Sequence, residues 1–493
     1  MIDTEALRKK VIDLAIQGKL TEQLPSDGDA ETLYAQIQDH KSQLIKEGKI
    51  KKDNELPEIS TDEIPFEIPD NWKWVRLGDL CLQITDGTHR TPAYQNDGIP
   101  FLSVKNISSG EFDLTDIKYI SEEEHSELIK RCKPEKNDVL VCRIGTLGKA
   151  ITIDIDLEFS IFVSLGLVKT TEKTVSDYIV QVINSGYGDS WIKDNKAGGA
   201  MHTYKINLNS LALLPVPLAP KSEIERILQL KDEVKKHIEN INNLQSKYSN
   251  DLAVLKSKII DAGIQGKLTE QLPSDGDAET LYTQIQEEKK QQIQKGLLRK
   301  TRGFNDITDD MIPFSLPNRW KVCYIDDVAF VTKLAGFEYT QYIADSICDE
   351  GIPLFKGKNI QKGELVLEFE SYIPHSVSDE LPRSKVCKKC LLTPYVGTIG
   401  NIALFNGEFD AHLGSNVGKI EILNPTKICL MEEYLLYYLR SSIGYSELTK
   451  HKKATAQDSI SIDAIRNVII SIPPIEEQKR IVKMIDELLQ IIG

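Results

Sequence analysis

The strongest constraint on the fold of this chain is an internal repeat. The segment IQGKLTEQLPSDGDAETLYAQIQ at residues 16–38 returns at residues 264–286 with one change, Ala35 to Thr283. The same offset of 248 residues relates IPFEIPDNWKW (64–74) to IPFSLPNRWKV (312–322). Weaker matches continue along both halves, at 97–107 with 350–360, 138–150 with 390–402 and 220–228 with 474–482. The sequence therefore predicts two copies of one folding unit.

Short helices are expected near the start of each copy. Gly18 and Gly266 are typical C-terminal caps for a first helix. A second helix is expected to begin near Asp29 or Asp277, because aspartate is a favoured N-cap residue. The second helices are expected to end near Gly48 and Gly296.

A much longer helix is expected from Pro220 to Gly263. Pro220 suits the first helical turn, and Ser222 with Glu225 has the spacing of a capping box. Apolar side chains then recur every seven residues, a spacing typical of a coiled coil, with a long helix packed on a core as the alternative. These side chains are Ile227, Val234, Ile241, Tyr248 and Leu255.

The stretches between the helices contain short β-like runs separated by Gly, Asn and Asp turns. The predicted fold class is α+β: two similar α/β domains separated by long antiparallel helices forming a coiled coil, with a pseudo-two-fold internal repeat. The predicted parts are an N-terminal helical region, a first globular domain, a central helical region, a second globular domain and a C-terminal helix that pairs with the N-terminal region. Their boundaries are 1–59, 60–217, 218–307, 308–472 and 473–493.

Composition excludes some classes of protein. The hydrophobic content of 41% supports sizeable cores, and no apolar run approaches the ~18 residues that span a bilayer. The start, MIDTEALRKK, lacks the apolar region of a signal peptide, so a cytoplasmic protein is expected. The net charge of −14 argues against a simple basic DNA-coating protein, although local basic patches remain compatible with it.

Catalytic and metal-binding motifs are weak. Of eight cysteines, only Cys387 and Cys390 have the spacing of metal ligands, and no second pair accompanies them, so free thiols are favoured over a metal site. The segment from Gly145 to Lys149 departs from the phosphate-binding loop in spacing and in the residue after the lysine. Leu392-Thr-Pro-Tyr395 lacks the amide or carboxylate and one proline of the amino-methyltransferase motif. We therefore expect no catalytic residue and no cofactor on this chain.

The order of these segments resembles the specificity subunits of Type I restriction–modification enzymes over essentially the whole chain. The resemblance rests on IPPIEEQKRIV (472–482), on the IQGKLTEQ element, on the Gly-x-x-Gly turns after strands at 138–149 and 391–401, and on Trp72 and Trp320. It implies a non-catalytic subunit in which each of two target-recognition domains reads one half of a split, asymmetric DNA site. It also implies that two methyltransferase subunits bind the helical regions and that motor-nuclease subunits join for cleavage.

S-adenosylmethionine, ATP and Mg would then be bound by the partner subunits. One departure is PKSEIERI in the first copy, which lacks the usual Glu-Gln pair and puts the equivalence of the two partner surfaces in doubt.

DNA-contact candidates are polar and basic residues of the globular stretches. Arg and Lys can pair with guanine, Asn and Gln with adenine, and the cations with phosphates, while an ordinary solvated loop is the alternative for each residue. The loops 196–204 and 451–457 occupy equivalent places before the closing helix. The candidates are Thr88, His89, Arg90, Lys105, Asn106, Arg143, Lys149, Lys196, His202, Tyr204, Lys356, Lys358, Asn359, Tyr395, Asn401, His451, Lys452, Lys453 and Gln457.

Partner-docking candidates come from the repeated helical segments. Nearly identical surfaces suit two copies of one protein partner, whereas the differing globular stretches suit different ligands. The candidates are Leu20, Leu24, Leu33, Tyr34, Leu268, Leu272, Leu281 and Tyr282. Two rival functions stay open at this point: a coiled-coil scaffold without DNA selectivity, and a self-sufficient DNA methyltransferase or nuclease.

Overall fold

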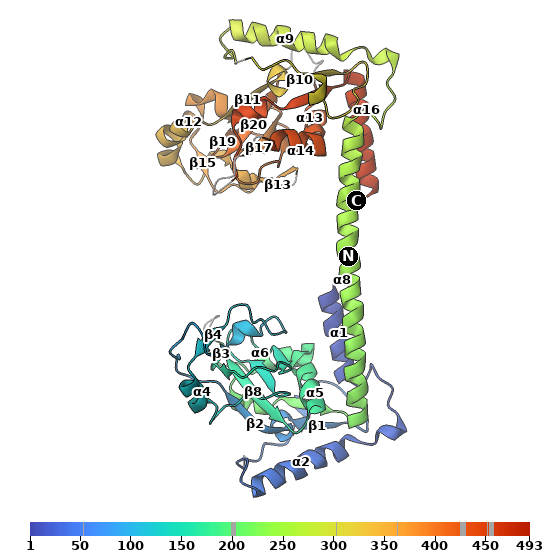
Figure 1. Cartoon of the computed structure of the whole chain (residues 1–493), viewed down its shortest axis with the longest axis vertical. Helices are drawn as coiled ribbons and strands as arrows, with labels where there is room; N and C mark the ends of the chain where they lie inside the picture. The colour runs from blue at the N-terminus through green and yellow to red at the C-terminus, as the bar shows by residue number, and fades with distance from the viewer. Residues whose placement is uncertain are drawn as a thin grey trace. The chain divides into compact units, whose positions relative to one another are not determined.

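The chain folds into two compact units, residues 1–246 and 247–493 (Figure 1). The computed structural model describes residues 1–493 except 53, 199–203, 302, 362, 424–429, 451 and 453–457. Both units mix helices with small sheets, which confirms the predicted α+β class. The boundary between the units falls inside one long helix, α8 (Lys221–Ile264).

The first unit is built on antiparallel strands. A ribbon of β1 (Lys73–Arg76) and β9 (Pro215–Leu218) accompanies a sheet in the order β2-β8-β5-β6 and a second sheet in the order β4-β3-β7. These strands are β2 (Cys81–Asp86), β8 (Leu165–Thr170), β5 (Val139–Cys142), β6 (Ala150–Thr152), β4 (Lys118–Ile120), β3 (Ile99–Leu102) and β7 (Ser160–Ile161). The helices are α1 (Thr4–Ile16), α2 (Ala30–Lys46), α3 (Leu77–Leu80), α4 (Glu122–Leu128), α5 (Lys173–Asn184), α6 (Gly186–Asp194) and α7 (Leu208–Ala212).

The second unit repeats the main strand order. The ribbon is β10 (Lys321–Tyr324) with β21 (Ile469–Ile472), and the sheet has the order β11-β20-β17-β18. Its strands are β11 (Ala329–Lys333), β20 (Val417–Ile422), β17 (Cys390–Pro394) and β18 (Ala403–Phe405). A further sheet has the order β15-β12-β19-β16, and β13 pairs with β14. These strands are β15 (Tyr372–Ile373), β12 (Ile352–Phe355), β19 (Ala411–Leu413), β16 (Lys385–Val386), β13 (Ile360–Gln361) and β14 (Glu364–Leu365).

The helices of the second unit follow the same plan around its sheets. They are α9 (Ala278–Gln294), α10 (Ile325–Val328), α11 (Gly336–Glu338), α12 (His375–Glu380), α13 (Glu432–Arg440), α14 (Ser442–Thr449), α15 (Ile462–Arg466) and α16 (Ile475–Ile491).

The central strand β5 shows why the apolar runs fold as buried strands. Successive side chains of a strand point to opposite faces. Val139 and Val141 enter the core that also contains Trp72 and Tyr178, whereas Leu140 lies in a second core on the other face of the sheet. Because both faces are covered, the whole run is apolar rather than alternating.

The predicted helix boundaries agree with the structure. Asp29 caps α2 by accepting a hydrogen bond from the Thr32 amide at 2.9 Å. Gly18 and Gly48 follow α1 and α2 with φ angles of +65° and +71°, a conformation that glycine adopts without strain.

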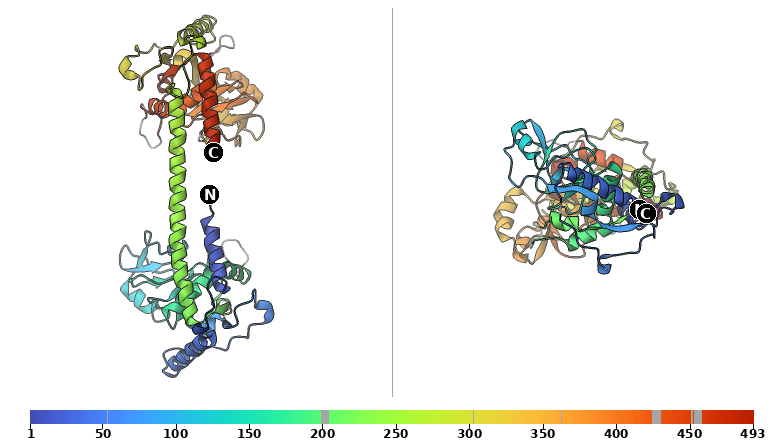
Figure 2. Two further views of the ribbon diagram at one scale, coloured as in Figure 1. Left: turned by 90° about the vertical axis from the view of Figure 1, so that its right-hand side faces the viewer. Right: turned by 90° about the horizontal axis from the view of Figure 1, so that it is seen from below.

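In each unit, α8 lies antiparallel to a shorter helix (Figures 1 and 2). In the first unit this helix is α1, and Thr4 Oγ1 donates to Asn242 Oδ1 at 2.8 Å. In the second unit it is α16, whose Ile485 lies so close to Gly263 that an added Cβ there would be 2.6 Å from the Ile485 Cδ1 atom.

The heptad positions of α8 are covered unevenly. Ile227 is buried and Val234 and Ile241 are half-buried, but Tyr248 is 63% exposed and Leu255 is 44% exposed. The spacing correctly predicts one long helix, and the coiled coil stays a prediction.

Candidate functional site

A buried carboxylate fastens the repeated segment to the closing helix of each unit. Glu223 of α8 is fully buried and accepts hydrogen bonds from Thr21 Oγ1 at 2.7 Å, Gln23 Nε2 at 2.9 Å and Trp72 Nε1 at 2.8 Å. In the second unit Glu477 of α16 accepts from Thr269, Gln271 and Trp320 at 3.3, 2.9 and 2.9 Å. The two clusters are chemically the same.

A second carboxylate reinforces this attachment. Both oxygens of Asp27 accept from the guanidinium of Arg226, at 2.6 and 2.7 Å, and these bonds lower the pKa of Asp27 to about 2. Asp275 and Arg480 form the same pair in the second unit at 2.8 and 2.6 Å. Together the two carboxylates and their donors form what we call the carboxylate latch. Its members are Thr21, Gln23, Asp27, Trp72, Glu223 and Arg226, and Thr269, Gln271, Asp275, Trp320, Glu477 and Arg480.

The latch changes two sequence-based interpretations. Because α8 begins at Lys221, Ser222 lies inside the helix and not at its N-cap, so the predicted capping box at Ser222 and Glu225 is wrong, and Ser222 Oγ donates to Asp27 instead. The departure in PKSEIERI is also smaller than it looked. Glu223 occupies the place of Glu477, so within the Glu-Gln pair only the second residue differs, with buried Ile224 in place of buried Gln478.

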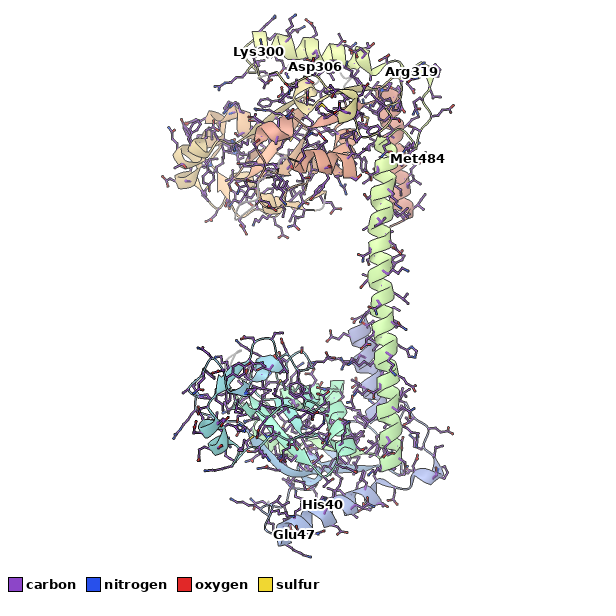
Figure 3. All side chains as sticks on the ribbon, in the orientation of Figure 1. His40, Glu47, Lys300, Asp306, Arg319 and Met484 are labelled. Atoms are coloured by element: carbon purple, nitrogen blue, oxygen red, sulfur yellow. The ribbon has the colours of Figure 1, made fainter. Side chains whose placement is uncertain are left out.

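The predicted docking residues fall into two groups. Leu33 and Leu281 face the cores of their units, so we no longer propose them as partner contacts. Leu24 is 37% exposed, and the remaining candidates, Leu20, Tyr34, Leu268, Leu272 and Tyr282, are half-buried. Beyond them α2 offers an exposed polar face that includes His40 and Glu47, and Met484 of α16 is partly exposed (Figure 3).

One end of the first unit's main sheet gathers charged groups around Asp86, the last residue of β2. The buried Asp86 carboxylate accepts from Arg131 Nη1 at 3.0 Å, from Arg143, and lies 3.1 Å from His89 Nε2. Arg143 follows β5 and is buried, and its Nε donates to the Ile206 carbonyl at 3.1 Å. Arg143 is therefore held in a fixed position with its side chain buried.

The neighbouring loops meet at the same end of the sheet. Ile144 pairs with Lys205 as an isolated bridge, which joins the turn containing Lys149 to the loop after α6. In that loop the Lys196 ammonium lies 4.5 Å from the centre of the Tyr204 ring. A cavity of about 350 Å³ is lined by Thr88, His89, Arg90 and Arg131, among others. The structure thus brings most of the predicted contacts of the first unit together, and it adds Arg131, which carries no motif.

The second unit places different chemistry at the corresponding strand ends. Lys333 pairs with Gly418 as Asp86 pairs with Gly166, and Tyr395 follows β17 as Arg143 follows β5. The Lys333 ammonium lies 4.5 Å from the centre of the Tyr395 ring, and burial raises the pKa of the Tyr395 hydroxyl. An acid–arginine pair in one unit is therefore replaced by a lysine–tyrosine pair in the other.

Other predicted contacts have varied surroundings. Asn106 and Asn359 are buried, and their amides donate to backbone carbonyls of neighbouring loops, so we no longer propose them as DNA contacts. Lys105 is exposed, Lys356 donates to Ser371 Oγ at 2.8 Å, and Lys358 pairs with Glu370. Asn401 donates to the Ile360 carbonyl at 3.2 Å, and Lys452 pairs with Asp458 at 2.5 Å. Four candidates lie outside the described residues: His202, His451, Lys453 and Gln457.

The described residues contain neither a cluster of metal ligands nor a helix suited to a bilayer. Within the described part of the chain, no three His, Cys, Asp or Glu side chains are grouped so as to hold a metal ion. Cys387 is exposed whereas Cys390 is buried. None of the described helices combines the length and hydropathy needed to cross a bilayer.

The two α+β units share one frame and one attachment chemistry but carry different pairs of side chains at the equivalent strand ends. Comparisons with known proteins show what the chain is similar to. Residues 335–493 match the family described as the Type I restriction modification DNA specificity domain. The chain is 24% identical to the Type I restriction enzyme EcoAI specificity subunit of Escherichia coli, over 98% of this chain and 88% of that protein.

Two further similarities agree with this assignment. The chain is 22% identical to the Type I restriction enzyme MjaVIII specificity subunit of Methanocaldococcus jannaschii, over 86% of this chain and 88% of that protein. A chain solved in work on the complex assembly and conformational transition of the type I R-M system has the same fold, with a TM-score of 0.56 and 17% identity over 87% of this chain and 92% of that one. These similarities confirm the resemblance to the specificity subunits of Type I restriction–modification enzymes that is seen in the sequence.

Proposed function

We propose that this chain is a specificity subunit that reads a bipartite, asymmetric DNA site, with one half-site contacted by each globular domain. In this proposal the chain itself catalyses nothing. Methyltransferase subunits dock on its helical regions, and motor-nuclease subunits join them for cleavage. S-adenosylmethionine, ATP and Mg belong to those partners.

The observation that carries the proposal is the contrast between constant and variable positions. The carboxylate latch has the same residue types in both units, whereas the equivalent strand ends carry Asp86 with Arg143 in one unit and Lys333 with Tyr395 in the other. Base edges are distinguished by the donors and acceptors that meet them, and arginine is the commonest partner of guanine. Two different sets of donors on one frame suit two different half-sites.

A protein partner accounts for features that DNA would not. The middle of α8 exposes Tyr248, Val254 and Leu255, at 63%, 52% and 44%. Apolar side chains gathered on one exposed helix suit a protein surface better than a phosphate backbone. The net charge of −14 further suggests that the partners make part of the contacts with the DNA backbone.

The decisive experiment is co-expression with the cognate methyltransferase subunit, followed by sequencing of methylated genomic DNA. We expect a split motif whose two halves change separately when residues 60–215 or 308–470 are exchanged for those of a relative. Arg90→Ala, which removes an exposed cation lining the cavity of the first unit, should relax the first half alone, and Lys333→Ala with Tyr395→Phe should relax the second half alone.

A matched control is Lys388→Ala. Lys388 is an exposed cation next to the start of β17, at the opposite end of that strand from Tyr395. This variant should leave the motif unchanged. A stable complex whose methylation pattern is indifferent to all of these changes would favour the scaffold function instead. Methylation by the purified chain alone would favour the self-sufficient enzyme.

A further inference from the structure

A polar cavity of about 400 Å³ in the second unit lies beside the turn that follows β17. Its walls come from that turn, from the junction of α13 and α14, from Gly363, and from Ser257 of α8. Arg440, the last residue of α13, is its one cationic lining residue, and no carboxylate lines it. A site of this charge is suited to an anion.

Arg440 is held in place without being neutralised. Gly363 has a φ angle of +92°, and an added Cβ there would lie 2.5 Å from the Arg440 Cζ atom, so the guanidinium rests directly on backbone. The side chain is exposed, and within the described part of the chain it has no ion pair and no hydrogen bond. An arginine with a fixed position and free donors is prepared to bind a ligand rather than to stabilise its own fold.

The first unit fills the equivalent place differently. The junction is the same, because the amides of Gly186 and Ser442 donate to Asp13 and Asp261 at 2.6 and 2.7 Å. There Asn184 replaces Arg440, and its amide bonds both backbone groups of Ala150, at 2.9 and 2.8 Å. At the end of this helix the second unit therefore has an arginine where the first unit has an asparagine bonded to its own backbone.

A second difference between the units lies three residues after this junction. Asp189 of the first unit pairs with Lys193 at 2.8 Å, whereas Tyr445, the corresponding residue of the second unit, is 50% exposed and lines the cavity. The first unit thus presents an acid, while the second presents a hydroxyl near a free guanidinium.

We propose that Arg440 binds a backbone phosphate of duplex DNA next to the half-site read by the second unit, a proposal that rests on the function proposed above. The planar guanidinium matches two phosphate oxygens at once. Hydroxyls from Ser257, Ser442 and Tyr445 line the same cavity and supply the neutral donors that commonly accompany arginine at phosphates. The adjoining turn, which contains Asn401, connects this cavity to Tyr395 at the reading surface.

The test measures DNA binding by the complex of the full chain with its methyltransferase subunits, for cognate and unrelated duplexes between 50 and 200 mM salt. Loss of one phosphate contact lowers the slope of log affinity against log salt by about 0.9, so the fourfold change in salt should cost Arg440→Ala about 3.5-fold less affinity than it costs wild type. Arg440→Ala should also weaken all duplexes alike and leave the methylation motif unchanged. Arg440→Lys should retain most of the salt dependence, and Lys388→Ala should behave as wild type.

Each alternative has its own outcome. If Arg440→Ala matches wild type in affinity and salt dependence while the complex still selects its cognate site, the phosphate contact is refuted and the proposed function stands. A change at one base of the motif would make Arg440 a base reader and would also refute it. If inorganic phosphate displaces DNA from wild type and from Arg440→Ala equally well, inorganic phosphate does not bind at Arg440, and this result also refutes the proposed contact. A wild-type complex without sequence selectivity would remove the proposed function and this site with it.

Discussion

Glu223→Gln is the sharpest test of the carboxylate latch, because it preserves shape and removes only the second acceptor. Three donors converge on the carboxylate: Thr21 and Gln23 on one oxygen, and Trp72 on the other. A glutamine offers one oxygen and one NH₂ group. With its oxygen toward Thr21 and Gln23, its NH₂ group faces the Trp72 N–H, and both donors lose their partners.

The magnitude follows from these bonds. Two buried donors left without partners cost about 1–3 kcal/mol each, and two charge-assisted bonds that become neutral lose about 1 kcal/mol together. We therefore expect a loss of at least about 3 kcal/mol from the free energy of unfolding of the first unit, a large part of the ~5–15 kcal/mol typical of a domain. Hydrogen exchange of the β5 and β8 amides should then accelerate by about a hundredfold where exchange needs global opening.

The assay is hydrogen–deuterium exchange followed by mass spectrometry, which reads the two units separately in one molecule. Glu225→Gln is the matched control, because Glu225 is an exposed residue of the same helix. Glu477→Gln should reproduce the effect in the second unit. Acceleration of less than about threefold in Glu223→Gln, comparable to the control, would refute the idea that the three donors depend on this carboxylate.

Three further outcomes are expected. The pKa of Asp27 is lowered from 3.8 to about 2, so its stabilisation should be full above about pH 4 and be lost as pH falls toward 2. Because its arginine partner is 32% exposed, solvent screening limits this contribution to ~1 kcal/mol; Asp27→Asn should remove both that stability and the acid-dependent loss, measured by thermal unfolding from pH 5 to 2. Arg143→Ala should destabilise the first unit by ~1–3 kcal/mol in urea unfolding, because it leaves the buried Asp86 carboxylate with fewer donors. Cys387 should react with a thiol reagent in the native protein, whereas Cys142, whose pKa burial raises to about 12, should react only after unfolding.

The helix boundaries could be predicted because the signals for them are local. Asp29 before α2 and Gly18 after α1 use chemistry that operates within three or four residues, so the helix boundaries could be read directly. The seven-residue spacing likewise predicts one long helix. It does not say what covers each position, and Tyr248 and Leu255 turn out to be exposed.

Contacts between distant residues were invisible in the sequence. Thr21 and Glu223 are 202 positions apart, and neither segment contains a pattern that predicts a contact with the other. Asn106 is no longer proposed as a DNA contact because of such contacts. A polar residue in a loop is a reasonable candidate for binding DNA, but the side-chain amide of Asn106 donates to backbone carbonyls and holds the neighbouring loop in place. Arg131 was missed because a single arginine after a helix has no signature until Asp86 is placed beside it.

The latch bears on why residues 16–38 are repeated almost unchanged. Part of the identity is required by folding, because Thr21, Gln23 and Asp27 bond the closing helix and Leu33 fills the core. Other identical positions have exposed side chains, so the fold does not explain them. A partner present in two copies would need those same exposed residues at both places.

Glu22 and Glu270 separate these two causes of identity. Both glutamates are exposed, and neither side chain forms a hydrogen bond or ion pair within the described residues. Glu22→Lys with Glu270→Lys should therefore leave hydrogen exchange in both units unchanged and reduce co-purification of the methyltransferase subunit. Unchanged co-purification would mean that these positions contact no partner, and the identity there would then reflect the history of the repeat rather than docking. Accelerated exchange would instead assign them to the fold.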